Sequence, residues 1–302
     1  MQFRNKGVGI LDSRKPQSND NDQYRDYSDS LFDITMAFQP IVDTVNERIL
    51  GYEALLRGKQ GESPAEILPR VPPAERFHFD LRCRDRAIEL SAALGNPGLL
   101  CINFLPNAIF DPHANLLATL AAAKHHGWPA ERIIFEFTEV EPIQDGVLMH
   151  QIVQTLGDSG FGTAIDDFGA GYAGLNLLAN FHPNIVKLDM GLIRGIDSDH
   201  RRQAIIAGIM KVCGRLALEV IAEGIETAAE HAWLRGQGIR LFQGFFFARP
   251  QTEALPQVSF TDPFVKTRAR PLPVQDEQLK DLLHMAGVTD GMDCNQPLAA
   301  SK

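Results

Sequence analysis

The chain is organised around the stretch Gly160-Phe161-Gly162-Thr163-Ala164-Ile165-Asp166-Asp167-Phe168-Gly169-Ala170-Gly171-Tyr172. A short apolar run ends there in two adjacent carboxylates, and a glycine-rich turn leads into an amphipathic segment. Neighbouring acids repel each other unless a cation neutralises them, and carboxylate oxygens suit hard divalent metals such as magnesium, manganese and calcium. The simpler interpretation is a helix start, where acids complement the dipole. The rest of the chain decides between the two.

The same stretch carries a glycine spacing that is typical of dinucleotide-binding turns. Gly169, Gly171 and Gly174 have this spacing, and Asp189 follows about twenty residues later. We reject this interpretation because two acids just before the turn would repel a pyrophosphate unless a metal lay between them. The turn also lies in the middle of the chain rather than in a first strand–helix unit.

Composition limits the classes of protein and partner. Of the 302 residues, 44% are hydrophobic and 22% charged, which is ordinary for a soluble globular protein with a substantial core. The net charge of −9 argues against a nucleic-acid polymer as the main partner, but a small nucleotide could still bind through metal ions. The cysteines (Cys83, Cys101, Cys213 and Cys294) have no paired metal spacing, and we interpret them as reduced thiols of a cytoplasmic protein. No membrane segment or signal-peptide core is apparent.

Three segments are expected. Residues 1–30 are polar and predict a flexible leader. Residues 31–262 are expected to form one catalytic barrel. Residues 263–302 form a C-terminal tail, in which residues 276–286 could make one short helix.

Short apolar runs alternate with helical patterns along the middle segment. Strands are predicted at 34–42, 48–56, 99–104, 132–137, 161–165, 185–188, 218–222 and 239–242. Helices are predicted at 74–94, 113–126, 146–156, 172–181, 200–216 and 227–236. Eight strands separated mainly by helices indicate an α/β fold, a (β/α)8 barrel of the TIM type, with a doubly wound open sheet as the alternative.

The first two predicted strands break the regular pattern. Residues 43–47 join them in a short polar turn. A parallel crossover needs a dozen residues or more, so these two strands should be antiparallel. The prediction is therefore a modified TIM-type barrel with an antiparallel first strand.

Polar side chains recur at or near the ends of seven predicted strands. They are Glu53, Asn103, Glu136, Asp166, Asp167, Lys187, Glu223 and Gln243. Any one of them has an ordinary explanation, such as a rim salt bridge or a turn former. Together they would meet at the carboxyl face of a barrel, where active sites are built. Five converging carboxylates need cations, and the chemistry that suits them is metal-assisted hydrolysis of a phosphate ester.

Seven motifs follow one another along roughly residues 34–250. They are Phe38-Gln39-Pro40-Ile41-Val42-Asp43, Glu53-Ala54-Leu55-Leu56-Arg57, Glu136-Phe137-Thr138-Glu139, Asp166-Asp167-Phe168-Gly169-Ala170-Gly171-Tyr172, Lys187-Leu188-Asp189, Ala222-Glu223-Gly224-Ile225-Glu226-Thr227 and Gln243-Gly244-Phe245. In this order they resemble the motifs of the EAL-domain family of cyclic di-GMP phosphodiesterases. The family fold is a modified (β/α)8 barrel with one antiparallel strand. Its enzymes open one phosphodiester of cyclic di-GMP to linear pGpG with Mg²⁺ or Mn²⁺.

The resemblance implies two metal sites and a set of catalytic groups. One metal would be bound by Glu53, Asn103, Glu136 and Asp166. The second would face Asp166 and Asp167, with support from Glu223. Lys187 would position or help deprotonate the attacking water, alongside Glu53 and Glu223 as catalytic residues.

It also implies substrate contacts and a coupling loop. Substrate would be bound by Gln39, Leu55, Arg57 and Gln243, with the Arg57 guanidinium on a phosphate. Many family members are homodimers, in which residues 168–175 would link the metal site to the dimer interface. Glu139 and Glu226 would anchor that loop.

The sequence departs from the family pattern at positions that are not metal ligands. Leu105 and Gly58 stand where a serine and a tryptophan are common, and Tyr172-Ala173-Gly174-Leu175 lacks two hydroxyls. These differences bear on turnover rate and regulation. The alternatives left open are a non-catalytic cyclic di-GMP sensor or protein-interaction module, and a barrel enzyme for another phosphate ester.

Overall fold

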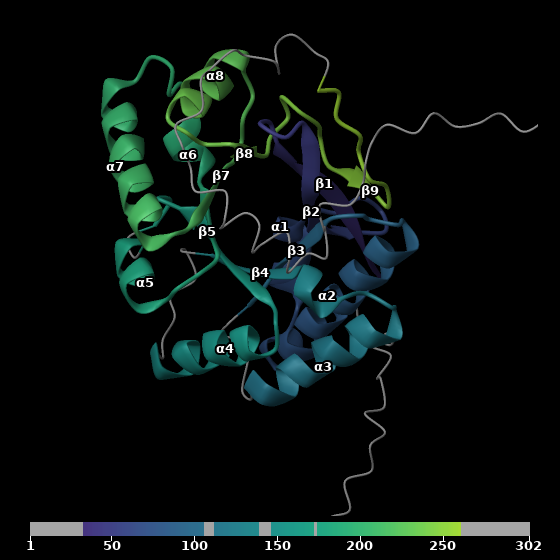
Figure 1. Ribbon diagram of the computed structural model, residues 1–302. Helices are drawn as coiled ribbons and strands as arrows, with labels where there is room; N and C mark the ends of the chain where they lie inside the picture. Colours follow the sequence, from purple (N-terminus) through teal and green to yellow (C-terminus); the bar gives the residue numbers. More distant parts are fainter. Residues whose placement is uncertain (1–32, 106–111, 139–145, 172–173, 261–302) are drawn as a thin grey trace, which may run out of the picture.

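The computed structural model describes residues 33–105, 112–138, 146–171 and 174–260, in which eight strands close into a barrel surrounded by helices (Figure 1). The barrel strands are β1 (Ile34–Asp43), β2 (Arg48–Gly58), β3 (Leu99–Asn103), β4 (Ile133–Thr138), β5 (Gly162–Phe168), β6 (Ile185–Leu188), β7 (Glu219–Ala222) and β8 (Leu241–Phe242). The longer helices are α2 (Arg76–Ala93), α3 (Pro112–His125), α4 (Gly146–Asp158), α5 (Gly174–Asn180), α7 (His200–Leu216) and α8 (Ala228–Gly236). The predicted α/β barrel is confirmed.

Strands β2 to β8 pair in parallel and in sequence order, and β1 closes the ring between β8 and β2. β1 is antiparallel to both neighbours. The turn after it is tight because the Asp43 carboxylate accepts the N–H groups of Val45 and Asn46 at 3.1 and 3.0 Å. The prediction that the short turn makes the first two strands antiparallel is confirmed.

The barrel has an inner and an outer core. The inner core is one cluster of buried apolar residues to which all eight barrel strands contribute: Ile41, Leu50, Leu99, Cys101, Ile134, Ala164, Ile185, Ile221 and Leu241. The outer core lies between strands and helices and contains aromatic residues such as Phe135, Phe137 and Phe161. A filled interior is expected, because an eight-stranded barrel is only wide enough for side chains.

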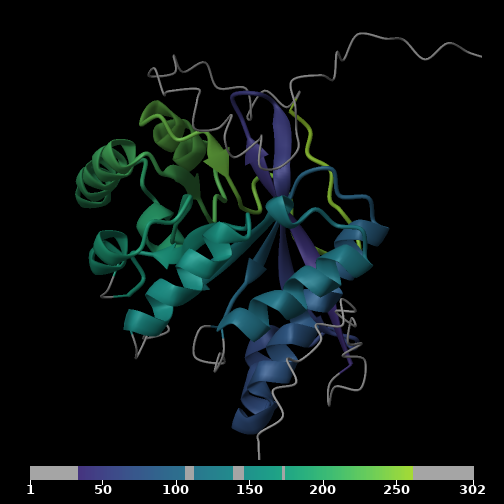
Figure 2. The same ribbon diagram turned by 60° about the horizontal axis from the view of Figure 1, so that its bottom comes forward.

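The helices cover the outside of the strands. In both views α2 and α3 lie side by side, and α5 and α7 cover the other flank (Figures 1 and 2). Four short helical turns, α1 (Pro64–Ile67), η1 (Leu68–Arg70), η2 (Pro73–Glu75) and α6 (Met190–Ile193), were not predicted. Neither was η4 (Ala130–Arg132). Helix α5 begins at Gly174, two residues after the expected start, and residues 172–173 lie outside the described part of the chain.

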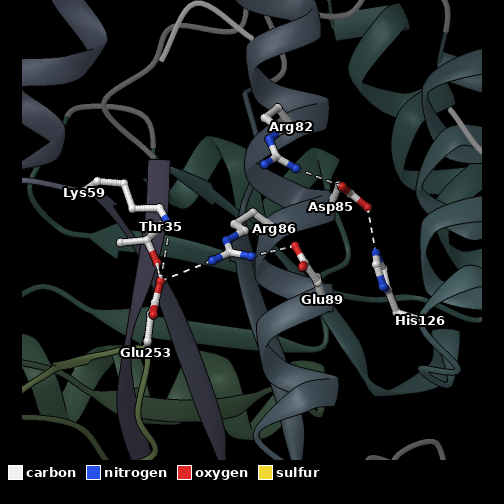
Figure 3. Close-up of polar contacts among 8 residues, drawn as sticks. All are labelled: Thr35, Lys59, Arg82, Asp85, Arg86, Glu89, His126 and Glu253. Atoms are coloured by element: carbon white, nitrogen blue, oxygen red, sulfur yellow. Dashed lines mark hydrogen bonds and ion pairs between the residues drawn. The ribbon is translucent and has the colours of Figure 1, made fainter. Parts of the chain in front are cut away.

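A short strand, β9 (Gln251–Thr252), follows the barrel and pairs with β1, which the sequence did not predict. Glu253 fastens this segment through three elements, as Figure 3 shows. Its Oε1 accepts a hydrogen bond from the Thr35 hydroxyl at 2.6 Å and one from Arg86 Nη2 at 3.2 Å, and it lies 3.8 Å from Lys59 Nζ. The last described segment is therefore fixed to β1, to α2 and to the end of β2.

The expected leader (1–30), the expected tail (263–302) and its helix at 276–286 fall outside the described residues. Within the described ranges, no helix is both long and apolar enough to cross a membrane.

Candidate functional site

Eight polar side chains form one layer directly above the inner core. In six parallel strands each polar residue comes two positions after an inner-core residue, as Ile134 and Glu136 or Ile185 and Lys187 illustrate. Because side chains alternate with a period of two, both members of such a pair face the barrel axis. The full layer is Gln39, Glu53, Asn103, Glu136, Asp166, Lys187, Glu223 and Gln243. Gln39 belongs to it because it pairs with Glu53 across β1 and β2.

Lys187 lies at the centre of this layer and is completely buried. Its Nζ lies 2.7 Å from Glu223 Oε1, 2.9 Å from Glu136 Oε1, 3.0 Å from Asp166 Oδ1 and 3.3 Å from Glu53 Oε2. One ammonium thus contacts four carboxyl groups that come from β2, β4, β5 and the residue directly after β7.

Asp166 and Asp167 both reach the site although they are sequence neighbours. In a regular strand consecutive side chains point to opposite faces. Asp167 has a positive φ of 53°, and the pairing of β5 with β6 shifts register between Ile165 and Phe168. This bulge changes the direction of one side chain, so both carboxylates line the same pocket.

Glu53 is held by a chain of amides. Its Oε1 accepts from Asn103 Nδ2 at 3.3 Å and its Oε2 from Gln243 Nε2 at 2.7 Å. Gln243 Nε2 also donates to Gln39 Oε1 at 3.2 Å, and Gln39 Nε2 donates to the carbonyl of Ala248 at 3.2 Å. The structure therefore brings together four residues that the sequence predicted as ligands or substrate contacts.

The cluster holds more negative groups than positive ones. Burial raises the pKa of Glu136 and of Glu223 well above the usual range, although Lys187 opposes this. Burial would lower the pKa of Lys187, but Asp166, Glu136, Glu223 and Glu53 outweigh it and raise that pKa well above its ordinary value. Burial, followed by the charges of Asp166 and Asp189, raises the pKa of Asp167 to about 6. Glu136 and Glu223 therefore hold protons more strongly than ordinary carboxyl groups, and bound cations would displace these protons.

The geometry of the acids fits divalent cations. Two groups of carboxylates, Glu53–Glu136–Asp166 and Asp166–Asp167–Glu223, each offer oxygens within 4.8 Å of one another. Glu136 Oε2 is buried without a hydrogen-bond partner in the described part of the chain. All donors are oxygens, which suits hard cations of the magnesium, manganese and calcium class. Asp166 belongs to both groups.

A pocket of about 300 Å³ opens beside the acids. Its lining includes the predicted Gln39, Glu53, Asp166, Asp167, Glu223, Glu226 and Gln243. It also includes Asp189, Met190, Arg194 and Phe245, which sequence reasoning did not assign to the site. Asp189 follows β6 as the cap of α6 and accepts the Gly191 N–H at 2.7 Å. Its position just after a strand was the signal that could have revealed it.

The remaining predicted residues are two that do not line this pocket, one that does, and one outside the described ranges. Leu55 and Arg57 are half-buried on β2 beyond Glu53, and Arg57 Nη1 donates to the Leu56 carbonyl at 2.6 Å. Glu226 lies on the pocket rim, where its Oε1 accepts from Arg194 Nη2 at 2.8 Å. Glu139 lies outside the described residues, so its role as a loop anchor stays a prediction.

Comparison with known proteins identifies related chains. Residues 25–250 match the model of the EAL domain. A blue light- and temperature-regulated antirepressor of Escherichia coli K12, BluF, is 33% identical over 227 residues, covering 75% of this chain and 56% of that protein. A probable cyclic di-GMP phosphodiesterase of the same organism, PdeN, is 31% identical over 229 residues, covering 71% and 43%. The chain thus spans about half the length of these curated relatives.

Solved structures agree with these matches. A standalone versatile EAL protein from Vibrio cholerae O395, in a c-di-GMP bound form, is 49% identical with a TM-score of 0.75, covering 77% of this chain and 99% of that one. A manganese and cyclic di-GMP complex of BlrP1 from Klebsiella pneumoniae is 35% identical with a TM-score of 0.71, covering 75% and 58%. A calcium complex of BlrP1 is also similar, at 36% identity and a TM-score of 0.69, covering 75% of this chain and 58% of that one.

Proposed function

The chain belongs to the EAL-domain family, and from this premise we propose that its barrel hydrolyses one phosphodiester bond of cyclic di-GMP to give linear pGpG. The observation that carries the proposal is the convergence of Glu53, Glu136, Asp166 and Glu223 on Lys187. The similarity to a probable cyclic di-GMP phosphodiesterase, PdeN, and to an EAL protein in a c-di-GMP bound form supports the same substrate.

Two divalent ions, Mg²⁺ or Mn²⁺, are the cofactors that we propose. Glu53, Asn103, Glu136 and Asp166 would hold one, and Asp166, Asp167 and Glu223 would hold the other. When bound, such ions acidify water and neutralise charge that develops on the phosphate and the leaving oxygen. The unsatisfied Glu136 oxygen and the excess of carboxylates are what favour this occupancy.

The chain's own groups would orient the reactants and manage the protons. As the water oxygen bonds to phosphorus it loses one proton, and the sugar oxygen that leaves phosphorus takes one up. The Lys187 ammonium already donates towards four acids, so it can orient the water among them. Glu53 and Glu223 flank Lys187 and are the carboxylates that would carry the transferred proton.

Substrate would occupy the pocket next to the acids. Gln39 and Gln243 line it, and their amides can turn from each other to the ligand. Arg57 uses one of its five donors on the Leu56 carbonyl, so four others can reach a phosphate at the open end of β2. Leu55 precedes it and would contribute an apolar contact.

A homodimer and a cytoplasmic location complete the proposal. The dimer rests on the family resemblance, with residues 168–175 and the anchors Glu139 and Glu226 as its proposed link to the site. Residues 31–262 would be the catalytic unit, between a leader at 1–30 and a tail at 263–302.

The ligand assignment has a direct test. Glu53→Ala and Asp166→Ala should abolish hydrolysis of cyclic di-GMP, measured by chromatography of the nucleotides with Mn²⁺ present. Wild-type turnover in either variant would show that these residues are not the essential ligands.

A second function, binding without turnover, is favoured by one observation. The relative BluF is named as an antirepressor, that is, by a regulatory role. Titration calorimetry with cyclic di-GMP, followed by nucleotide analysis of the same sample, separates the two functions. Tight binding with no pGpG after long incubation in Mn²⁺ would favour the regulator.

A further inference from the structure

A buried ion pair outside the barrel lies directly behind the end of β3. Arg84 of α2 is only 1% exposed, and Asp80, one turn earlier, is 3% exposed. Arg84 Nη2 donates to Asp80 Oδ2, and Nη1 donates to Asn115 Oδ1 at 2.6 Å and to the Thr119 hydroxyl at 3.0 Å. Asn115 and Thr119 belong to α3, so the pair joins the two helices that flank β3.

The same pair contacts the two residues that follow Asn103. The Phe104 ring lies under the Arg84 guanidinium, 4.7 Å from Cζ to the ring centroid. The N–H of Leu105 donates to the Asp80 carboxylate. The N–H of Phe104 donates to the Glu136 carbonyl at 2.9 Å. The chain just after Asn103 is therefore fixed at three points, two of which are the ion pair.

Asn103 depends on this support because its own side chain is weakly held. The residue is exposed, and its Nδ2 donates to Glu53 Oε1 over a long 3.3 Å. That bond leaves Oδ1 of Asn103 to act as the ligand. The position of the carboxamide must then come from the backbone, which Asp80 and Arg84 fix.

Stability alone does not account for a buried pair at this place. Well-packed apolar residues of similar size can often replace a buried ion pair without loss of stability. Such residues could not accept the Leu105 N–H or hold the Phe104 ring through a cation. The geometry of the β3 end is what the pair provides.

We propose that Asp80 and Arg84 are positioning residues that hold the Asn103 carboxamide in place as a metal ligand. This inference rests on the two-ion phosphodiesterase proposed above. Groups behind a first ligand shell commonly change metal affinity by 10–100-fold when they are replaced.

The test is a Mn²⁺ titration of metal-free protein without substrate. The variant Asp80→Leu/Arg84→Met removes both charges together, so it leaves no uncompensated buried charge. We expect Mn²⁺ binding about tenfold weaker at one site, and a kcat that recovers at saturating Mn²⁺. If this variant does not fold, Arg84→Lys keeps the charge but loses the planar fork, and it should weaken Mn²⁺ binding in the same direction.

A matched control lies on the same helix. Asp85 also joins α2 to α3, through His126 Nε2 at 3.0 Å, and it contacts Arg82 at 3.3 Å (Figure 3). His126 follows the last residue of α3, at the end of that helix away from Asn103. Asp85→Asn should loosen the helix pair and lower the melting temperature without changing Mn²⁺ affinity.

The decisive comparison uses Asn103→Ala as a background. If the pair acts through Asn103, adding Asp80→Leu/Arg84→Met to Asn103→Ala should cause no further loss of Mn²⁺ affinity. Additive losses, unchanged affinity in the folded double variant, or a wild-type protein that binds no Mn²⁺ would overturn the inference. Wild-type protein that binds Mn²⁺ but forms no pGpG would instead contradict the proposed function, while the titration still tests the positioning role.

Discussion

Lys187 Nζ lies 2.7 Å from Glu223 Oε1, the shortest of four contacts that this buried ammonium makes with carboxyl groups. Lys187 lies in β6 and Glu223 directly follows β7, and these adjacent parallel strands end on the same face. One cation cannot neutralise all of the acids, so the site attracts further positive charge. The catalytic role that we propose for Lys187 and the metal binding that we propose for the acids would both follow from this excess of carboxyl groups.

Replacing Lys187 should affect both properties. Lys187→Met should lower kcat by at least about 100-fold, the size expected for loss of a group that acts on proton transfer. In chelator the variant should also melt at a lower temperature than the wild type, because the acids lose their internal cation, and Mn²⁺ should restore much of the difference. Lys211→Met, on the exposed side of α7, is the control and should change neither value. Full activity in Lys187→Met would exclude the proposed role.

The ion pair of Arg194 and Glu226 at the pocket should couple the site to the dimer, because Glu226 is the proposed anchor of the loop at residues 168–175. Glu226→Ala should lower activity while leaving the fold intact. In the structure Glu226 contacts Arg194, so Arg194→Ala should have the same effect if the pair acts as a unit. Kinetics and sedimentation should be measured on both variants. Unchanged kinetics together with an unchanged oligomeric state would count against the coupling role of Glu226.

His231 predicts a loss of stability in acid that is independent of the metal site. The ring is buried among Phe242, Phe246 and Phe247. Neither ring nitrogen has a hydrogen-bond partner among the described residues. Burial, and then the charge of Arg235, lowers the pKa of His231 to about 4. The imidazole in the unfolded chain therefore binds a proton more readily than the buried one. The stability that comes from burying the neutral ring is fully present above pH 6.5 and is lost as the pH falls towards 4.

His231→Phe removes this titration. We compare the free energy of unfolding of the variant with that of the wild type at two pH values. The difference should favour the variant by about 2 kcal/mol more at pH 4.5 than at pH 7.5, since each pKa unit corresponds to about 1.4 kcal/mol. Urea unfolding at the two pH values measures this change. Equal differences at both pH values would show that His231 does not titrate in this way.

Two glycines provide a matched pair for packing. A Cβ on Gly51 would lie 2.4 Å from the Leu99 carbonyl oxygen, a backbone atom in the next strand that cannot move freely. A Cβ on Gly208 in α7 would meet nothing within 4 Å. Gly51→Ala should therefore destabilise the barrel by about 1–3 kcal/mol, and Gly208→Ala should stabilise it by about 0.5–1 kcal/mol. Thermal unfolding of the two variants measures both changes in stability. A Gly51→Ala variant as stable as the wild type would contradict the close approach of β2 and β3 at Gly51 and Leu99.

Much of the barrel could be predicted because its signals are local. Apolar runs that end in a polar residue mark each strand end, as Ile134 and Glu136 show, and a short turn after Asp43 is enough to make the first strands antiparallel. The alternation of side chains then determines which residues share the inner face. Gln39, in contrast, entered the predicted site only through the family resemblance.

Other features depend on contacts between distant residues and give no local pattern. β9 has two residues, too few for a period, and Glu253 anchors it to Thr35, which is 218 positions away. Asp80 and Arg84 have the spacing of an ordinary exposed helix pair, so hydropathy suggests solvent and gives no sign that both are buried. Asp189, Arg194 and Phe245 join the pocket through the arrangement of the strand ends.

The most direct test of the central claim is incubation of the purified protein with cyclic di-GMP and Mn²⁺ or Mg²⁺, followed by chromatographic separation of the nucleotides. We expect pGpG to form in the wild-type protein and to disappear with chelator or with Glu53→Ala. Intact cyclic di-GMP after long incubation, with binding shown by titration of the same sample, would contradict the enzymatic function and leave a protein that only binds the nucleotide.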